Sequence, residues 1–582
     1  MDKIVRRRDI DPGSELSGLA ESDLHPLLGR IYRGRGITSV DELDLGLGQL
    51  LPPDSLLHAE AAAKLLADAL AAQQKITVVG DFDADGATST ALVVSALRTM
   101  GANDVGYLVP NRFEYGYGLT PEIVALAAQD KPDLIITVDN GISSIEGVAA
   151  AAAAGIRTLV TDHHLAGRTL PAAEVIVNPN QPGCTFASKN LAGVGVIFYI
   201  MLALRAELRR RDWFGANSIA EPNLAQYLDL VALGTVADVV SLDRNNRILV
   251  AGGLQRIRAG QARPGIQALL EIAGRSPATL VASDLGFAVG PRLNAAGRLD
   301  DMSIGIECLL SPDSHSARPL ASQLHQFNQD RRVIEQGMQE EALTLLAGIE
   351  LAEGEEPPVG ITLYDPGWHQ GVVGILASRI KDRLHRPTIA FADAEDGEIK
   401  GSARSIPGIH IRDILDAVAT RHPGLVSKFG GHAMAAGLSL ERDAYEDFAV
   451  AFVAEVARHA EDINLQAVID SDGELLPDDF NLELASALRF AGPWGQHFPE
   501  PLFDGCFNIV QQRLVGDKHL KLVLAVPGTG ELVDAIAFNV DLEVWPNPAQ
   551  DQVAAVYRLD VNEFRGRRSL QLVIEHLTIP GH

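Results

Sequence analysis

The chain has 582 residues, of which 47% are hydrophobic, and carries a formal net charge of −27 at pH 7. Such a length suggests about three or four domains, and no apolar run reaches the roughly 18 to 20 residues that span a bilayer. The basic start, MDKIVRRRDIDPG, lacks the apolar segment of a secretory signal. The three cysteines, Cys184, Cys308 and Cys506, are far apart, which argues against a disulfide framework, and we expect a cytoplasmic protein.

The acidic charge argues against a nucleic-acid partner, because phosphate binding usually leaves a basic footprint on a protein. The argument is limited, since an enzyme can bind a polyanion through a local basic path and metal ions while its outer surface stays acidic. A nucleic-acid partner therefore requires that the sequence contain such a path.

The first half of the chain alternates between helical and extended patterns. Continuous apolar strands separated by helices are typical of a parallel, doubly wound sheet, and ligands of such sheets bind at the carboxyl ends of the strands. Thr120 is the expected N-cap of one of the helices. The predicted strands are 75–80, 104–110, 133–141, 158–164 and 173–180, and the predicted helices are 58–74, 87–101, 120–131 and 143–155.

Acidic motifs follow three of these strands: DFDADG, VDNG and DHH. In DFDADG, Asp81, Asp83 and Asp85 alternate, and in an extended segment such residues share one face. Their carboxylates repel one another unless a cation lies between them, so the run is either a solvated loop or part of a metal site. The alternatives for the other motifs are an Asx-type turn at Asp139 and a surface or core histidine pair in DHH.

The rest of the chain predicts three further regions. Residues 194–275 are predicted to be mostly helical, and 313–348 to form one long polar helix. A domain boundary is predicted at 351–360, and a second α/β pattern follows it. After about 465, five strand patterns separated by turns indicate a small β-barrel. We place the domains at 1–45 (N-terminal segment), 46–312 (catalytic domain), 313–350 (connecting helix), 351–462 (second α/β domain) and 463–582 (barrel).

The order and spacing of DFDADG, VDNG, DHH and GTVADVV resemble the four motifs of the DHH phosphoesterase superfamily. Further segments resemble the RecJ exonucleases within it: NRFEYGYGL, LAGVGV, GPRLNAAGRL, GWHQGVVGILASRI, GSARS, FGGHAMAAGL and VGDKHLKL. The resemblance covers residues from about 40 to 575. It implies an α/β fold with a parallel doubly wound DHH domain, a long connecting helix, a smaller DHHA1-like α/β domain and a C-terminal OB-like β-barrel. One loop, WGQHF at 494–498, departs from the family's shorter glycine- and asparagine-rich form.

The resemblance also implies a site for Mn²⁺ or Mg²⁺, with two ions expected, because hard divalent cations prefer carboxylate oxygens and imidazole suits Mn²⁺ as well. Asp139 is suited to bridge the ions, and His164 resembles the family's catalytic histidine; direct ligation by Asp81 and by Asp162 is left open. The expected ligands are Asp81, Asp83, Asp85, Asp139, His163 and Asp238.

A path for DNA is expected at arginines, glycines and lysines within the family-like motifs, since arginine is the usual bidentate partner of phosphate. Aromatic residues 113, 115 and 117 are candidates for base stacking, with core packing as the alternative. The phosphate or DNA contacts expected are Arg112, Arg292, Arg298, Ser402, Arg404, Gly430, Gly431, His432, Lys518 and Lys521.

The resemblance to the RecJ exonucleases implies an enzyme that degrades single-stranded DNA from the 5′ end to 5′ mononucleotides in recombination and repair. A single-stranded DNA-binding protein and a helicase are the expected protein partners, and no membrane is expected. One alternative is a DHH phosphodiesterase that acts on short oligonucleotides or cyclic dinucleotides, which generally lacks the barrel. Another is a DNA-binding protein without catalysis, which is expected to have lost ligands that this chain retains.

Overall fold

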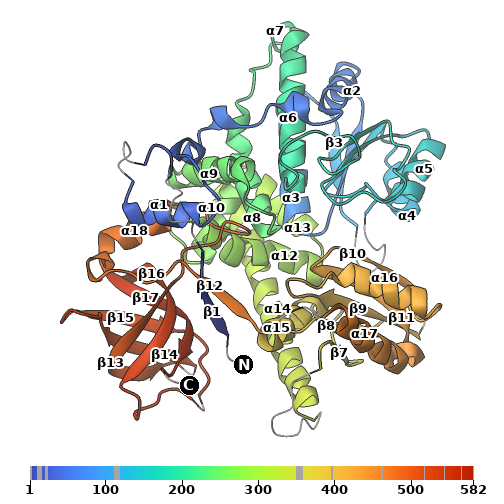
Figure 1. Cartoon of the computed structure of the whole chain (residues 1–582). Coiled ribbons are helices and arrows are strands. Elements are labelled where there is room, and N and C mark those ends of the chain that lie inside the picture. Colours follow the sequence, from blue (N-terminus) through green and yellow to red (C-terminus); the bar gives the residue numbers. More distant parts are fainter. Residues whose placement is uncertain are drawn as a thin grey trace. The chain divides into compact units, whose positions relative to one another are not determined.

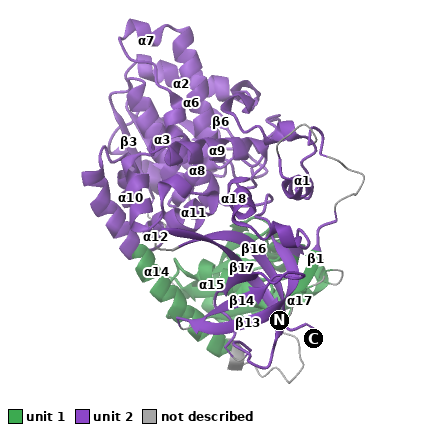
Figure 2. Ribbon diagram, turned by 90° about the vertical axis from the view of Figure 1, so that its left-hand side faces the viewer, with its two compact units in different colours: residues 1–6, 327–469 green, residues 7–326, 470–582 purple. Residues whose placement is uncertain are grey.

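The computed structural model describes residues 3–9, 16–19, 24–110, 118–348, 358–394, 397–460, 463, 465–516, 518–542, 544–564 and 566–580. Two compact units are present, residues 1–6 with 327–469 and residues 7–326 with 470–582, and Figure 2 colours them separately. The predicted sequence boundary near residue 313 falls at the start of α14 (Ser314–Gly348), the long helix that was expected there. This helix has residues in both units.

The larger unit contains the expected parallel sheet, in the order β3-β2-β4-β5-β6. Each strand is a short apolar run, and β2 and β4 are buried along their whole length, as strands covered on both faces must be. The strands are β2 (Ile76–Gly80), β3 (Val105–Leu108), β4 (Leu134–Val138), β5 (Arg157–Thr161) and β6 (Val175–Val177).

Helices cover both faces of this sheet, as Figure 1 shows. On one face, α4 and α5 pack on Val79, Ile135 and Val160, and Thr120 caps α4 as predicted. On the other side, α3 contacts α6 and α8. The helices of this part are α1 (Pro26–Arg33), α2 (Ala59–Ala71), α3 (Ala84–Thr99), α4 (Pro121–Ala128), α5 (Ile145–Ala153), α6 (Gly193–Arg210), α7 (Trp213–Ala216), α8 (Leu228–Ala237), α9 (Arg244–Arg258), α10 (Pro264–Ile272), α11 (Ala282–Asp284), α12 (Gly290–Leu299) and α13 (Ser303–Leu310).

The C-terminal part of the same unit is a closed barrel, in the order β13-β14-β15-β17-β16, preceded by α18 (Leu482–Phe490). Closure leaves no open sheet edge. The five strand patterns of the sequence therefore correspond to the five barrel strands. These are β13 (Phe503–Val515), β14 (His519–Ala525), β15 (Leu532–Ala537), β16 (Gln552–Phe564) and β17 (Arg567–Thr578).

The smaller unit contains the second α/β fold, a sheet in the order β10-β11-β9-β8-β7. Helices α16 and α17 pack on one face through Phe391, Leu415 and Phe448, and α15 packs on the other with the end of α14. The elements are β7 (Ile361–Tyr364), α15 (Val373–Leu384), β8 (Thr388–Asp393), β9 (Glu398–Arg404), α16 (Ile411–Arg421), β10 (Lys428–Gly431), β11 (Ala435–Glu441) and α17 (Tyr445–His459). A separate two-stranded sheet joins β1 (Ile4–Arg7) and β12 (Val468–Ser471).

No helix in the described ranges is both long enough and apolar enough to cross a bilayer. This finding agrees with the absence of a long apolar run in the sequence.

A buried ion pair joins the N-terminal part of the larger unit to the segment that leads into the barrel. The guanidinium of Arg35 donates to both carboxylate oxygens of Asp472, at 2.8 and 3.0 Å, and to the carbonyl of Pro499 at 2.7 Å. Both side chains of the pair are 1% exposed. Removal of one member of such a pair leaves an uncompensated charge in a medium that solvates it poorly.

We expect Arg35→Met to lower the free energy of unfolding of the larger unit by about 3 kcal/mol, because buried Asp472 would lose both hydrogen bonds from Arg35 and keep only Arg8, whose Nε lies 3.6 Å from Oδ1. Urea unfolding followed by tryptophan fluorescence measures the change. The matched control is Arg318→Met, since Arg318 pairs with Glu271 while both side chains are more than 60% exposed, and it should unfold like the parent. Equal midpoints for the two variants would contradict the role of the buried pair.

Candidate metal centre

Acidic residues follow three neighbouring strands at one edge of the parallel sheet. Gly80, Val138 and Thr161 end β2, β4 and β5, and they are paired across the sheet in that order. Asp81, Asp139 and Asp162 come directly after these three residues. The prediction of a shared acidic edge is therefore confirmed, and it follows from the parallel direction of the strands.

The geometry of DFDADG differs from the extended run that the sequence suggested. Strand β2 ends at Gly80 and α3 already begins at Ala84, so Asp85 lies in the first turn of a helix. Asp83 is the N-cap of that helix and accepts hydrogen bonds from the backbone N–H groups of Asp85 and Gly86, at 2.9 and 3.0 Å. The prediction that the three carboxylates share one face of an extended segment is wrong, because the chain turns into α3 between Asp81 and Asp85.

Asp85 is held by the N-terminus of a second helix. Its carboxylate accepts hydrogen bonds from the backbone N–H groups of Gly193 and Val194, the first residues of α6, at 2.6 and 2.9 Å. The positive end of the helix dipole favours the ionised form of this buried acid. Glycine is required at 193, since a Cβ there would lie 2.6 Å from the Cβ of Asp139. The LAGVGV segment thus supports two candidate ligands at once.

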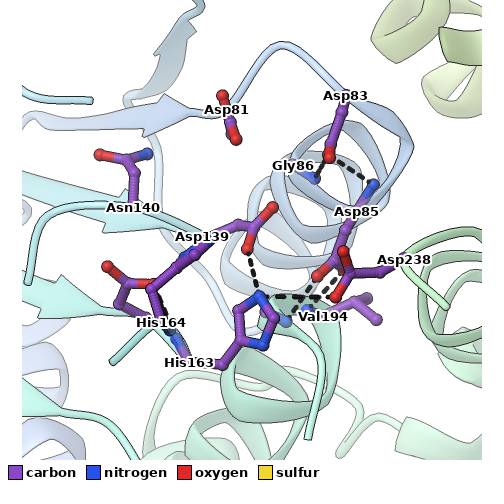
Figure 3. Close-up of polar contacts among 12 residues, drawn as sticks. Asp81, Asp83, Asp85, Gly86, Asp139, Asn140, His163, His164, Val194 and Asp238 are labelled. Carbon is purple, nitrogen blue, oxygen red and sulfur yellow. Dashed lines mark hydrogen bonds and ion pairs between the residues drawn. The ribbon is translucent and has the colours of Figure 1, made fainter. Parts of the chain in front are cut away.

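His163 lies at the centre of the site, between carboxylates from different elements (Figure 3). Its Nε2 atom is 3.1 Å from Oδ1 of Asp139 and 3.5 Å from Oδ2 of Asp238, the residue that ends α8. Asp139 has a φ of 62°, a left-handed conformation that aspartate and asparagine tolerate better than most residues. Atoms from the ends of β4, β5 and α8 therefore converge on one point.

The donor set fits a divalent cation. Three overlapping groups have ligand atoms that lie within 4.8 Å of one another: Asp139, His163 and His164; Asp85, His163 and Asp238; and Asp81, Asp83 and Asp139. Nε2 of His163 and Oδ2 of Asp238 are buried and make no hydrogen bond with any described residue. Buried polar atoms are normally satisfied, and oxygen donors with one imidazole suit Mn²⁺ and, except for the imidazole, Mg²⁺.

The crowding of acids perturbs their protonation when no cation is present. Burial and the nearby charge of Asp238 raise the pKa of Asp85 to about 7, and burial and the charge of Asp83 raise the pKa of Asp238 to about 8. The pKa of Asp139 is also raised, first by burial and then by Asp85. Burial lowers the pKa of His163, which keeps its imidazole neutral and able to bind a metal.

His164 differs from His163 because it has a dedicated acidic partner. Oδ1 of Asp162 lies 2.7 Å from Nδ1 of His164. Burial alone would lower the pKa of His164, but the hydrogen bond and charge of Asp162 outweigh burial and raise the pKa to about 9. The pKa of Asp162 is lowered, since the bonds from His164 outweigh its own burial. The raised pKa keeps His164 protonated at neutral pH, and Asp162 holds its Nδ1.

Three asparagines that the sequence did not single out also support the site. Nδ2 of Asn178 donates to the carbonyl of His164 at 2.9 Å, and Nδ2 of Asn180 donates to the carbonyl of His163. Oδ1 of Asn294 accepts from the N–H of Ala84, 2.7 Å away, at the start of α3. Asn178 and Asn180 follow β6 at the end of the strand predicted at 173–180, and Asn294 belongs to GPRLNAAGRL, a motif of the family.

The residues of the larger unit that were expected to contact DNA lie in different surroundings, from buried to exposed. Arg292 is only 7% exposed and donates to the carbonyl of Ala288 and to His325, an arrangement that favours a structural role. Arg298 is half-buried on the same helix, α12. On the barrel, Lys518 is exposed and Lys521 pairs with Asp534 at 3.1 Å. Arg112 and the candidate stacking residues Phe113, Tyr115 and Tyr117 lie outside the described residues.

The expected contacts in the smaller unit gather at one end of its sheet. Arg404 of β9 donates to Oγ of Ser402 at 3.0 Å, and it is paired in register with Ala435 of β11. Gly430 and Gly431 end β10, and His432 follows them in the turn that leads to β11. Gly431 has a φ of 147°, and a Cβ there would lie 2.4 Å from the carbonyl oxygen of Ala435. Glycine is therefore obligatory at this turn.

Comparison with known proteins identifies the family of this chain. The DHH family, N-terminal domain, matches residues 75–235; the DHHA1 domain matches 358–458; and the RecJ OB domain matches 471–576. The single-stranded-DNA-specific exonuclease RecJ of Dickeya dadantii is 59% identical over 95% of this chain and 96% of its own length. The chain belongs to the RecJ family. The fold class inferred from the sequence is thereby confirmed.

Solved structures of the family share the whole architecture. RecJ from Thermus thermophilus in complex with Mn²⁺ has a TM-score of 0.80 and 30% identity, over 100% of this chain and 80% of that one. RecJ from the same organism in complex with Mg²⁺ has a TM-score of 0.76 and 28% identity, over 100% and 79%. RecJ from Thermus thermophilus thus binds both cations that the donor set of this chain suits.

Cation binding should depend on pH, because cations and protons compete for the same carboxylates. Below pH 7 the raised pKa values keep Asp85 and Asp238 largely protonated, whereas both are ionised above pH 8. Mn²⁺ must displace these protons, so we expect its affinity to rise with pH from 6 to 8 and binding at pH 6.5 to release about one to two protons. Calorimetry in two buffers of different ionisation enthalpy measures both quantities.

The same pKa shifts determine the stability of the metal-free protein. A carboxyl group with a raised pKa holds its proton more tightly when folded than when unfolded, so metal-free stability falls as pH rises from about 4, where the unfolded acids ionise, and levels off above about pH 8. Saturating Mn²⁺ should therefore raise the melting temperature more at pH 8 than at pH 6. A smaller shift at pH 8 would contradict the assignment of these acids as ligands.

Proposed function

We propose that this chain is a metal-dependent exonuclease that hydrolyses single-stranded DNA from the 5′ end to 5′ mononucleotides, in recombination and repair. The observation that carries the proposal is the convergence of Asp85, Asp139, His163 and Asp238 on one point in a chain of the RecJ family. Every ligand position expected from the family motifs carries an aspartate or a histidine in this chain. A DNA-binding relative that had lost catalysis would be expected to lack some of these residues.

We propose two ions for this centre. Asp139 belongs to two of the three overlapping ligand groups, and His163 also belongs to two. Asp139 would therefore help to hold both ions, one with Asp81 and Asp83 and the other with His163, Asp238 and Asp85. Divalent ions in such a pair polarise a phosphate, lower the pKa of water and neutralise developing charge.

The chain's own residues then divide the remaining tasks. Asp162 holds His164 by Nδ1, and the protonated imidazole would donate through its other ring nitrogen to a phosphate oxygen or protonate the leaving oxygen. The asparagines that donate to the backbone carbonyls of His163 and His164 hold the backbone that carries both rings. Such fixed donors require little reorganisation during the reaction.

Single-stranded DNA is the proposed substrate, and the acidic surface requires that its phosphates meet local donors. Arg404, Ser402 and the glycine turn before His432 supply such donors, because their N–H groups and guanidinium gather at one sheet end. The rest of the strand would bind the barrel, at Lys518 and Lys521. OB folds bind single strands through a basic groove and through aromatic side chains that stack on the bases. We also propose a cytoplasmic location and, as partners, a single-stranded DNA-binding protein and a helicase.

The alternative within the superfamily is a phosphodiesterase for short oligonucleotides or cyclic dinucleotides. The match of residues 471–576 to the RecJ OB domain favours a long strand, since an added barrel has no evident use with a dinucleotide. Turnover of a labelled 50-mer beside a labelled dinucleotide separates the two functions.

We expect Asp139→Asn to lower kcat on single-stranded DNA by about 100-fold or more, because loss of the bridging charge removes several kcal/mol of transition-state stabilisation. Asparagine tolerates the positive φ at 139, so the fold should persist, and circular dichroism checks it. Asp130→Asn is the matched control, since that carboxylate is 80% exposed. Near-parental activity of Asp139→Asn with Mn²⁺ would exclude Asp139 from the centre.

Arg404→Ala should raise KM for a 5′-phosphorylated strand about tenfold, the effect of losing one charge-assisted hydrogen bond to phosphate. Mn²⁺ affinity of the DNA-free protein should stay unchanged, because Arg404 is not among the candidate ligands. Arg412→Ala, an exposed arginine of α16 in the same unit, serves as the control. An unaltered KM for Arg404→Ala would refute the phosphate contact.

A further inference from the structure

The loop that departs from the family's pattern forms a tight backbone hairpin in the larger unit. The N–H of Gly495 donates to the carbonyl of Phe498 at 2.9 Å, and the N–H of Phe498 donates back to the carbonyl of Gly495 at 3.1 Å. Residues 495–498, which we call the connector hairpin, lie between α18 and the first barrel strand. They belong to neither the metal ligands nor the expected DNA contacts.

The connector hairpin docks on the segment that directly follows a candidate metal ligand. The N–H of Leu242 donates to the carbonyl of Gln496 at 2.9 Å. Nδ1 of His497 lies 2.9 Å from Oγ of Ser241. Close approach is needed here, since a Cβ on Gly495 would lie 2.7 Å from Cδ1 of Leu242. Three consecutive hairpin residues therefore contact Ser241 and Leu242, three and four residues after Asp238.

The connector hairpin is itself firmly anchored. Phe498 is 4% exposed, and the guanidinium of Arg247 on α9 lies over its ring at 4.2 Å. The ring also stacks on Trp494 at 5.2 Å, and the indole N–H of Trp494 donates to the carbonyl of Leu488 at the end of α18. An anchored hairpin can hold its neighbour in place, whereas a solvated loop cannot.

The backbone after Asp238 requires such support. Val239 has a φ of 59° and is 63% exposed. A β-branched residue is a marked outlier in this left-handed region, and such conformations persist only where the flanking structure holds them. Upstream, α8 supplies one fixed end. Downstream, Gln496 and His497 hold Leu242 and Ser241, and Asn246 donates to the carbonyl of Ser241 at 2.9 Å.

We propose that His497 is a positioning residue of the metal centre: the connector hairpin fixes the Val239–Leu242 segment and thereby the direction in which Asp238 presents its carboxylate. The inference rests on the proposed metal-dependent function, because it gives Asp238 a cation to bind. Oδ2 of Asp238 makes no hydrogen bond with a described residue and lies 3.5 Å from Nε2 of His163, so the backbone that carries Asp238 contributes to its direction. The C-terminal region would then support the chemistry as well as the DNA.

The test measures Mn²⁺ binding to the full-length, DNA-free protein by calorimetry, together with kcat and KM on single-stranded DNA across a range of Mn²⁺ concentrations. His497→Ala should weaken Mn²⁺ binding about tenfold, the lower end of the effect of residues that orient ligands. The Mn²⁺ concentration for half-maximal activity should rise in parallel, with KM for DNA unchanged and kcat restored at saturating Mn²⁺. Ser241→Ala should have a similar effect, and the double variant should show less than the sum.

His497→Asn is the conservative variant, since asparagine tolerates the φ of 57° at this position and offers a polar atom near that of Nδ1. It should retain most of the affinity for Mn²⁺. His315→Ala, an exposed histidine at the start of α14, is the matched control and should bind like the parent.

Parental Mn²⁺ affinity in both His497→Ala and Ser241→Ala would overturn the inference. A raised KM for DNA with unaltered Mn²⁺ binding would also overturn it, and would assign the connector hairpin to DNA binding. Failure of the proposed function is a separate result, because it would appear in the parent protein as an absence of Mn²⁺ binding or of DNA hydrolysis.

Discussion

Mutual repulsion among carboxylates with little access to water is the constraint on which the metal centre depends. Asp85 and Asp139 are each 1% exposed, and Asp238 points at the same imidazole as Asp139. Without a cation, protonation of the carboxylates relieves the repulsion. The pKa values of all three acids are therefore raised. A divalent cation relieves it more completely, so the geometry favours cation binding over an empty site.

The surrounding fold keeps these acids in place without neutralising them. The N-terminus of α6 offers backbone N–H groups to Asp85, Asp83 caps α3, and Asn294 satisfies the N–H of Ala84. These are dipoles and not full positive charges, so the carboxylates stay available to an ion. A lysine or arginine in the same position would satisfy the acids and compete with the cation. Glycines at 193 and 234 permit the approach, because a Cβ at either position would press against Asp139 or Asp85.

Much of this arrangement could be predicted from the sequence, because apolar runs mark β2, β4 and β5 and the acidic residues follow each of them. The parallel direction of the strands then brings Asp81, Asp139 and Asp162 to one edge. The prediction from local sequence pattern was wrong at Asp85. Because Asp83 caps α3, this helix begins at Ala84, three residues before the helix start predicted at 87. Contacts between segments that are distant in the sequence could not be predicted from local patterns. Nothing in WGQHF indicates that Gln496 and His497 bind the residues after Asp238.

An acidic chain that binds DNA has a consequence for selectivity. A net charge of −27 repels a polyanion at long range, so encounter is favourable only where donors are concentrated and where cations occupy the carboxylate cluster. The glycines before His432 and the guanidinium of Arg404 are the donors that we propose, and they would require phosphates that approach the backbone closely. A flexible single strand can bend to bring successive phosphates to these points. A stiff duplex carries twice the charge along its axis and cannot adapt its path, so the same electrostatics that weaken DNA binding in general disfavour the duplex most.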